Sequence, residues 1–151
     1  MSVVISGTGL FTPSEYITNE ELVESFNEYV LKFNEDNKEL ISKGDLEALV
    51  PSSSEFIKKA SGIEQRFVQD KQGILDINRM RPKLNARPNS QISILAEMAI
   101  KASKEAMNQA EVDASDIDAV ICGCSNLQRA YPAVAIEIQE ELGINGYAYD
   151  M

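Results

Sequence analysis

The chain contains no histidine and only two cysteines, and these absences limit the chemistry that its 151 residues can perform. Without histidine it cannot form a Ser-His or Cys-His nucleophile pair, and it lacks the commonest proton shuttle at neutral pH. Cys122 and Cys124 are too few for a structural zinc site, so we interpret them as small packing residues and expect no bound metal. By itself, the chain is a poor candidate for acyl-transfer catalysis.

A long apolar run and a basic leader segment are also missing from the sequence. No apolar run approaches the ~20 residues that span a bilayer, and no basic segment precedes a long apolar stretch near the N-terminus. We therefore predict a cytoplasmic protein without a membrane partner. The net charge of −10 argues against nucleic-acid binding as well.

One stretch departs from this acidic balance. Residues 71–88 carry five basic side chains against Asp76 alone, a local charge of +4. The Arg-Pro-Lys and Asn-Ala-Arg-Pro-Asn sequences in it predict a loop. The basic residues are Lys71, Arg79, Arg81, Lys83 and Arg87.

The last 36 residues predict a βαβ unit. Residues 119–124 form an apolar run without alternation, which is typical of a strand buried on both faces. A polar loop leads to Pro132 at the start of a helix, and Gly143 ends that helix before a second strand over 147–151. In open α/β sheets, binding and catalytic residues lie just beyond the carboxyl ends of the strands. We therefore expect the active site to begin just after Met151.

Capping residues and periodicity predict the elements upstream. These are a strand over 3–13, a helix from Thr18 (capped with Glu21) to Gly44, a helix from Ser52 (capped with Glu55) to Gly62, a strand over 66–69, and a helix from Ser90 or Gln91. The helix that begins at Ser90 or Gln91 carries a stripe of alanines, which predicts that another backbone segment packs closely against it. Five acidic residues are expected to be ordinary surface charges: Asp116, Asp118, Glu137, Glu140 and Glu141. Together these elements predict a mostly parallel α/β protein.

Four segments, in order along nearly the whole chain, resemble the β-ketoacyl–acyl carrier protein synthases of type III in the thiolase superfamily. They read VVISGTGLFTP, SGIEQRFV, AYP and IEIQEELG. The sequence is most similar to members that accept medium-length acyl groups, such as β-ketodecanoyl-type synthases. The resemblance implies the N-terminal half of a thiolase-like αβαβα sandwich over residues 1–151, with insertions at about 27–51 and 71–89. The C-terminal half lies outside this chain.

The resemblance implies an acyltransferase of fatty-acid synthesis. Such enzymes are homodimers that condense an acyl thioester with malonyl–acyl carrier protein to a β-ketoacyl thioester, releasing carbon dioxide without a cofactor. A cysteine takes the acyl group, while a histidine and an asparagine stabilise the reacting oxygens. None of these catalytic residues is assigned here, because the nucleophilic cysteine is expected just after Met151. The 151 residues alone are expected to be inactive.

Several residues match family positions that line a site. Tyr131 matches an aromatic residue that reaches across the dimer into the partner's acyl pocket, and Phe56 stands where a tryptophan stacks on the adenine of coenzyme A. Ala60 replaces an arginine that contacts the same nucleotide, so the donor is either acyl-coenzyme A or an acyl–carrier protein. Three basic residues are candidates for docking an acidic carrier protein: Arg79, Arg81 and Lys83.

Each of these assignments has a purely structural alternative. Tyr131 is equally compatible with an ordinary loop, Phe56 with a helix core, and the basic residues with a solvated surface. For the whole chain the alternatives are a non-catalytic acyl- or carrier-binding half-domain, an inert truncation product, and a thiolase-fold enzyme that makes a different carbon–carbon bond.

Overall fold

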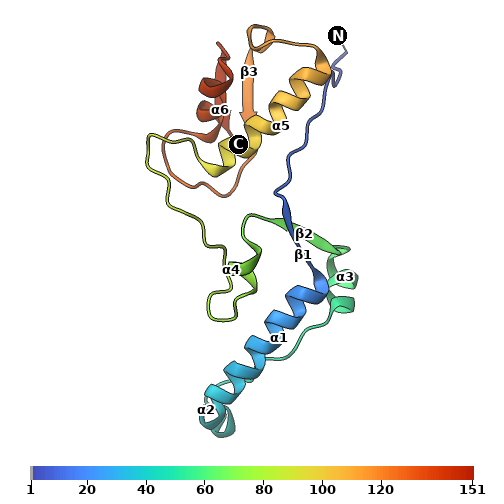
Figure 1. Cartoon of the computed structure of the whole chain (residues 1–151), viewed down its shortest axis with the longest axis vertical. Helices are drawn as coiled ribbons and strands as arrows, with labels where there is room; N and C mark the ends of the chain where they lie inside the picture. Colours follow the sequence, from blue (N-terminus) through green and yellow to red (C-terminus); the bar gives the residue numbers. More distant parts are fainter. Residues whose placement is uncertain (1) are drawn as a thin grey trace. The chain divides into compact units, whose positions relative to one another are not determined.

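The computed structural model describes residues 2–151, which divide into two compact units. Unit 1 combines the N-terminal segment through Thr12 with Ala86–Met151, and unit 2 is Pro13–Asn85. The elements are β1 (Glu15–Thr18), α1 (Asn19–Asp36), α2 (Lys38–Lys43), α3 (Ser54–Ser61), β2 (Gln65–Val68), α4 (Lys71–Leu75), α5 (Ile94–Ala110), a 3₁₀ turn (Ala114–Asp116), β3 (Ala119–Cys122), α6 (Val134–Leu142) and β4 (Tyr147–Asp150) (Figure 1). Within residues 2–151, no helix is both long enough and apolar enough to cross a membrane.

Unit 2 is built on an antiparallel pair of strands and the long helix between them. β1 pairs with β2 so that Thr18 lies opposite Gln65. The predicted capping box is confirmed, because Thr18 Oγ1 accepts from the Glu21 amide and the Glu21 carboxylate accepts from the Thr18 amide. The predicted single helix from Thr18 to Gly44 is interrupted at Asn37, which separates α1 from α2. α2 ends at Gly44 as predicted, with φ of 77°, a conformation that favours glycine.

Two asparagines of α1 hold the segment that follows α2. Asn27 both donates to and accepts from the backbone of Ser52, at 3.0 and 2.8 Å. Asn34 makes the same two-way pair with the backbone of Leu49, at 2.9 Å in each direction. The two asparagines are seven residues apart, about two helical turns, and therefore lie on one face of α1. Within the predicted insertion at 27–51, side-chain amides thus replace β-pairing in holding the returning chain.

Unit 1 is a βαβ layer in which α5 and α6 cover one face of the parallel pair β3–β4 (Figure 1). The predicted βαβ unit is therefore confirmed. Its core is a cluster of four buried residues, Ala96, Ile100, Val134 and Ile138. Val120 and Cys122 of β3 pack against this cluster from the sheet side.

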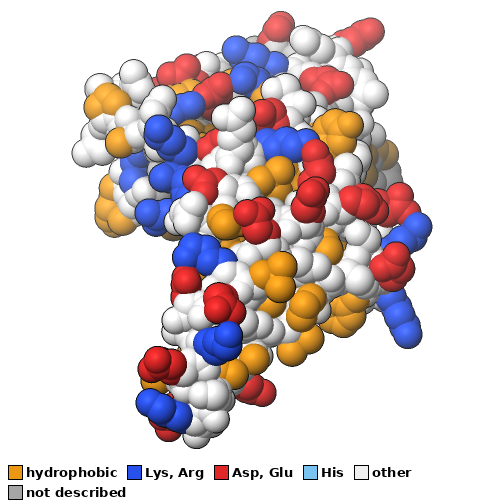
Figure 2. All heavy atoms as spheres, turned by 60° about the horizontal axis from the view of Figure 1, so that its bottom comes forward, with side chains coloured by type: hydrophobic (Ala, Val, Ile, Leu, Met, Phe, Trp, Pro, Cys, Tyr) orange, Lys and Arg blue, Asp and Glu red, His pale blue; other side chains and the backbone are white. Residues whose placement is uncertain are grey.

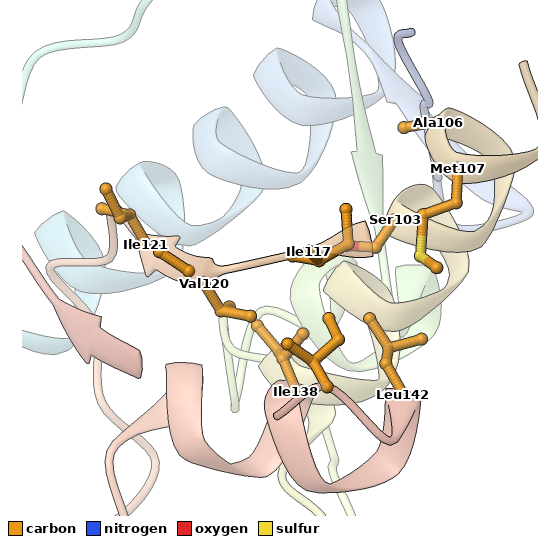
Figure 3. A pocket seen from close by; sticks show the side chains of 10 residues that line it. Ser103, Ala106, Met107, Ile117, Val120, Ile121, Ile138 and Leu142 are labelled. Atoms are coloured by element: carbon orange, nitrogen blue, oxygen red, sulfur yellow. The ribbon is translucent and has the colours of Figure 1, made fainter. Parts of the chain in front are cut away.

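The prediction that the strand at 119–124 is buried on both faces is wrong. Burial alternates along both strands, and Ile121 and Tyr149, which lie side by side in the register, are about half exposed (54% and 49%). Figure 3 shows Val120 directed toward Ile138 of α6, with Ile121 on the opposite side of the strand. The helices described here cover a single face of this sheet, so an apolar run alone does not produce burial on both sides.

The N-terminal segment also differs from the prediction, because residues 2–13 do not form the expected strand. Instead, the backbone amides of Thr8 and Leu10 donate to the side chains of Gln109 and Glu105 on α5. Gly9 lies against the backbone of α5, and a Cβ on Gly9 would sit 2.6 Å from the Ala106 nitrogen. The backbone that packs closely against the alanine stripe of α5 is therefore this extended N-terminal segment.

Two predicted helix starts shift, and the stretch predicted as a loop contains a short helix. α3 is capped by Ser53, whose hydroxyl accepts from the Phe56 amide, and not by Ser52. α5 begins at Ile94 behind the cap residue Ser93, a few residues later than predicted. The basic stretch is not entirely loop, because the Asp70 carboxylate caps the short helix α4 at its start. For α3 and α5, a serine one to three residues further along the chain sets the helix start.

We expect the substitution Gly9→Ala to destabilise the protein by about 1–3 kcal/mol, because the new methyl group meets helix backbone that cannot move aside. Gly123→Ala is the matched control, since a Cβ at Gly123 has no neighbour within 4 Å and no unusual φ is involved. Thermal or urea unfolding of both variants measures the effect. Equal stability of the two variants would contradict the packing of the N-terminal segment on α5.

Candidate functional site

The carboxyl ends of β3 and β4 meet at one edge of the unit 1 sheet. Cys122 and Asp150 are partners in the parallel register. The ladder continues one step further, because the Met151 amide donates to Cys122 O at 2.8 Å and the Cys124 amide donates to Met151 O at 3.3 Å. This is the edge at which parallel α/β sheets place ligands, and the loop 123–133 leaves from it.

Asp150 ties β4 to the start of α6. Its two carboxylate oxygens accept from the backbone amides of Val134 and Ala135, at 2.9 and 2.8 Å. α6 has no side-chain cap of its own, since its cap residue is Ala133. A carboxylate at a helix N-terminus satisfies free N–H groups and interacts favourably with the helix dipole. Sequence reasoning missed this role, although the absence of a capping residue before α6 was a signal that an outside group must supply it.

The Cys122 thiol at this edge is not activated. Partial burial, followed by the nearby Asp150 carboxylate and the Cys124 thiol, raises the pKa of Cys122 above its ordinary value. A thiol with a raised pKa remains protonated at neutral pH and is a poor nucleophile. Cys122 packs against the core cluster, which confirms its interpretation as a packing residue. Cys124 is half-buried, and its thiol contacts Asn126 O at 3.4 Å.

A buried polar cluster lies behind the same edge. Glu137 is 4% exposed, and its carboxylate accepts from both the amide and the hydroxyl of Ser93, at 3.1 and 2.5 Å. Arg129 faces the same carboxylate at 3.7 Å. The prediction that Glu137 is a surface charge is therefore wrong. Its spacing of three from Val134 and one from Ile138 places it on the apolar face of α6, and that spacing was the signal. The other four acidic residues of that prediction are exposed.

The predicted site residues lie in both units. Tyr131 belongs to loop 123–133 of unit 1, and its side chain is 87% exposed. Phe56 projects from α3 in unit 2 and is 65% exposed, so it is not a core residue of that helix. Arg79, Arg81 and Lys83 are exposed in unit 2, in the segment after α4. Nothing brings Phe56 and Tyr131 into one site within either unit.

The segment carrying these three basic residues is held by hydrogen bonds to its own backbone. The Arg79 guanidinium donates to Arg81 O and Pro82 O, at 3.1 and 3.4 Å. Hydrogen bonds from the backbone N–H groups of Lys83 and Gly73 hold the pKa of the Asp70 carboxyl below its usual value. Arg87, the remaining basic residue of the stretch beyond α4, belongs to unit 1 and pairs with Glu97 at 2.6 Å.

Two hollows are apolar and contain no catalytic groups. The hollow in unit 1 has a volume of about 250 Å³, and Ser103 is its single polar side chain among aliphatic residues of α5, β3 and α6 (Figure 3). A hollow of about 260 Å³ in unit 2 is lined by Phe26, Ile57 and Met80, among others. Among residues 2–151, no group of three or more acidic, cysteine or histidine side chains is arranged to hold a metal ion.

Comparison with known proteins gives a consistent result. The chain is 58% identical over 129 residues to the β-ketodecanoyl–acyl carrier protein synthase of Pseudomonas aeruginosa, a match covering 85% of this chain and 37% of that protein. It is 31% identical over 149 residues to the β-ketoacyl–acyl carrier protein synthase III of Dinoroseobacter shibae, covering 98% of this chain and 32% of that protein. The chain thus spans about a third of the length of these curated relatives. No protein-family model matches it.

Solved structures show the same fold. The 3-oxoacyl–acyl carrier protein synthase III of Aquifex aeolicus superimposes with a TM-score of 0.61 at 22% identity, covering 97% of this chain and 33% of that one. The corresponding synthase III of Pseudomonas aeruginosa gives a TM-score of 0.60 at 18% identity, covering 98% and 32%. The predicted thiolase-like α/β fold and the resemblance to type III β-ketoacyl synthases are therefore confirmed.

We expect Asp150→Asn to weaken the start of α6 by about 1 kcal/mol, because the charge on the helix N-terminus is lost. The same change should lower the pKa of Cys122, since it removes one of the causes that raise it. Urea unfolding and the pH dependence of thiol alkylation in a Cys124→Ser background measure the two effects. The exposed Asp118→Asn, at the opposite end of β3, serves as the control. An alkylation profile for Asp150→Asn identical to that of the control would refute the assigned electrostatic contact.

Proposed function

We propose that this chain is the N-terminal part of a β-ketoacyl–acyl carrier protein synthase of type III. The whole enzyme transfers an acyl group to a cysteine and condenses it with malonyl–acyl carrier protein, releasing carbon dioxide and forming a β-ketoacyl thioester for fatty-acid synthesis. The identity of 58% with a β-ketodecanoyl–acyl carrier protein synthase carries this proposal. The matching fold of the solved synthases supports it.

In this proposal, residues of this chain bind and orient the substrates, while the catalytic residues belong to another part of the protein. The nucleophilic cysteine is proposed to follow Met151, at the edge where β3 and β4 end, because Cys122 is held protonated and the chain has no histidine. Tyr131, exposed in its loop, is proposed to enter the acyl pocket of a second subunit in a homodimer. Phe56, exposed on α3, is proposed to stack on the adenine of an acyl-coenzyme A donor. The free thiols agree with the proposed location in the cytoplasm.

We expect a protein that continues past Met151 with its native sequence to form β-ketoacyl–acyl carrier protein from an acyl thioester and malonyl–acyl carrier protein. Mass spectrometry should find the acyl label on a cysteine beyond residue 151, both in this protein and in its Cys122→Ser/Cys124→Ser variant. The 151-residue chain alone should form no product. Labelling that disappears in the double variant contradicts the proposed nucleophile. Binding of the acyl carrier without any condensation favours the non-catalytic alternative.

The basic segment of unit 2 is proposed to dock the acidic carrier protein. Arg79, Arg81 and Lys83 are exposed, and Met80 between them lines the apolar hollow with Phe26 and Ile57. An apolar centre with a charged rim is the usual arrangement of a protein interface. Figure 2 shows acidic and basic side chains intermixed on the face it draws, with apolar side chains exposed between them. Residues 71–88 carry a local charge of +4 on a chain whose net charge is −10, so this group of like charges is a distinct feature.

We expect replacement of Arg79, Arg81 and Lys83 by serine to weaken the binding of holo-acyl carrier protein by about tenfold, because three rim contacts of about 0.5 kcal/mol each are lost. The salt dependence of binding should flatten as well. Replacement of Lys32, Lys38 and Lys43 by serine removes the same charge from α1 and α2 and serves as the control. Calorimetric titration at low and high salt measures both effects. Equal dissociation constants for the two triple variants at low salt would exclude this docking surface.

A further inference from the structure

Arg129 connects three separate segments of unit 1. Its guanidinium donates to Gln91 O at 2.7 Å and to Asn89 O at 3.3 Å, both in the segment that precedes α5. The same guanidinium lies 3.7 Å from the carboxylate of Glu137 on α6, and the Arg129 side chain is only 13% exposed. A planar guanidinium offers several donors in fixed directions, so a single side chain can hold all three groups at once.

Glu137 completes the connection from the other side. Its carboxylate is almost fully buried and accepts two hydrogen bonds from Ser93, whose hydroxyl also caps α5 by accepting from the Ala96 amide. Burying a carboxylate is unfavourable unless hydrogen bonds and an opposite charge compensate for the lost hydration. Arg129 supplies that charge from loop 123–133, so the position of the loop and the start of both helices depend on one another.

Tyr131 lies between two fixed points of the chain. Two residues before it, Arg129 is held by α6 and by the segment before α5, and three residues after it, the Val134 amide is held by Asp150. A third contact holds the loop, because the Gln128 side chain accepts a hydrogen bond from the Ile94 amide at 2.9 Å. An exposed aromatic residue in an otherwise irregular loop thereby receives a defined position without packing contacts of its own.

We infer that Arg129 and Glu137 are a positioning pair that fixes loop 123–133 at the carboxyl edge of the sheet and so sets the place of Tyr131. The fixing of the loop follows from the contacts within unit 1. Its consequence for function rests on the proposed role of Tyr131 in the acyl pocket: the pair determines which acyl chain length the enzyme prefers. Neither residue touches the substrate in this arrangement.

Amide hydrogen exchange on the purified chain tests the positioning. In Arg129→Gln and in Glu137→Gln, exchange within residues 125–133 should rise by about tenfold, because a charge-assisted contact that closes the loop is lost. Arg87→Gln is the matched control: Arg87 also donates to a carbonyl before α5 and pairs with a glutamate, but it does not contact the loop. Exchange in 125–133 that is unchanged in both variants, or that rises equally in Arg87→Gln, overturns the inference. If Arg129→Gln fails to fold, Arg129→Lys replaces it, since lysine keeps the charge but lacks the fork that reaches three partners.

Acyl-chain selectivity of the longer protein tests the consequence. The ratio of kcat/KM values for hexanoyl, octanoyl, decanoyl and dodecanoyl thioesters is measured for the unchanged protein, Tyr131→Ala, Arg129→Gln and Arg87→Gln. We expect Arg129→Gln to shift the preferred length in the same direction as Tyr131→Ala, with Arg87→Gln unchanged, and Arg129→Lys to restore part of the original profile. A shift in Tyr131→Ala without one in Arg129→Gln refutes the role of the pair in selectivity. No shift in Tyr131→Ala refutes the proposed role of Tyr131, and the exchange measurement then decides the positioning separately.

Discussion

The packing of α5 against α6 on one face of β3–β4 is the constraint on which the rest of unit 1 depends. The four residues at its centre, Ala96, Ile100, Val134 and Ile138, are nearly inaccessible to water. Because this contact places the start of α6 beside the end of β4, the Asp150 carboxylate reaches two free amides of the helix. The same contact carries Glu137 into the interior, where Ser93 and Arg129 must satisfy it.

Hydrogen bonds from polar groups then fix the segments that meet at the carboxyl ends of β3 and β4. Apolar contacts are not directional, so the core alone permits small displacements of the loop that leaves β3. The carboxylates of Asp150 and Glu137 remove that freedom, because each accepts hydrogen bonds from two identified donors. At this edge the pKa of the Cys122 thiol is raised, and the exposed Tyr131 lies between two hydrogen-bonded residues, Arg129 and Val134.

A different kind of contact holds the irregular segments of unit 2. Its returning segment is held by the side-chain amides of Asn27 and Asn34, and its basic segment by hydrogen bonds to carbonyl groups and to Asp70. These contacts are polar, and the apolar hollow lined by Phe26 and Met80 is open at the surface of unit 2. An open apolar surface beside exposed basic residues is the physical basis for the docking surface proposed for unit 2.

Most of the local elements could be predicted from the sequence, because capping boxes, αL glycines and helical periodicity act within a few residues. Thr18 with Glu21, Gly44, Gly143 and the βαβ order all follow from such signals. The contacts that each element makes became clear only from the three-dimensional arrangement. It placed Gly9 on the alanines of α5, left Ile121 exposed and buried Glu137, although these residues carry ordinary local signals. The reason is that burial depends on which distant segments arrive at a surface, and a short stretch of sequence does not contain that information.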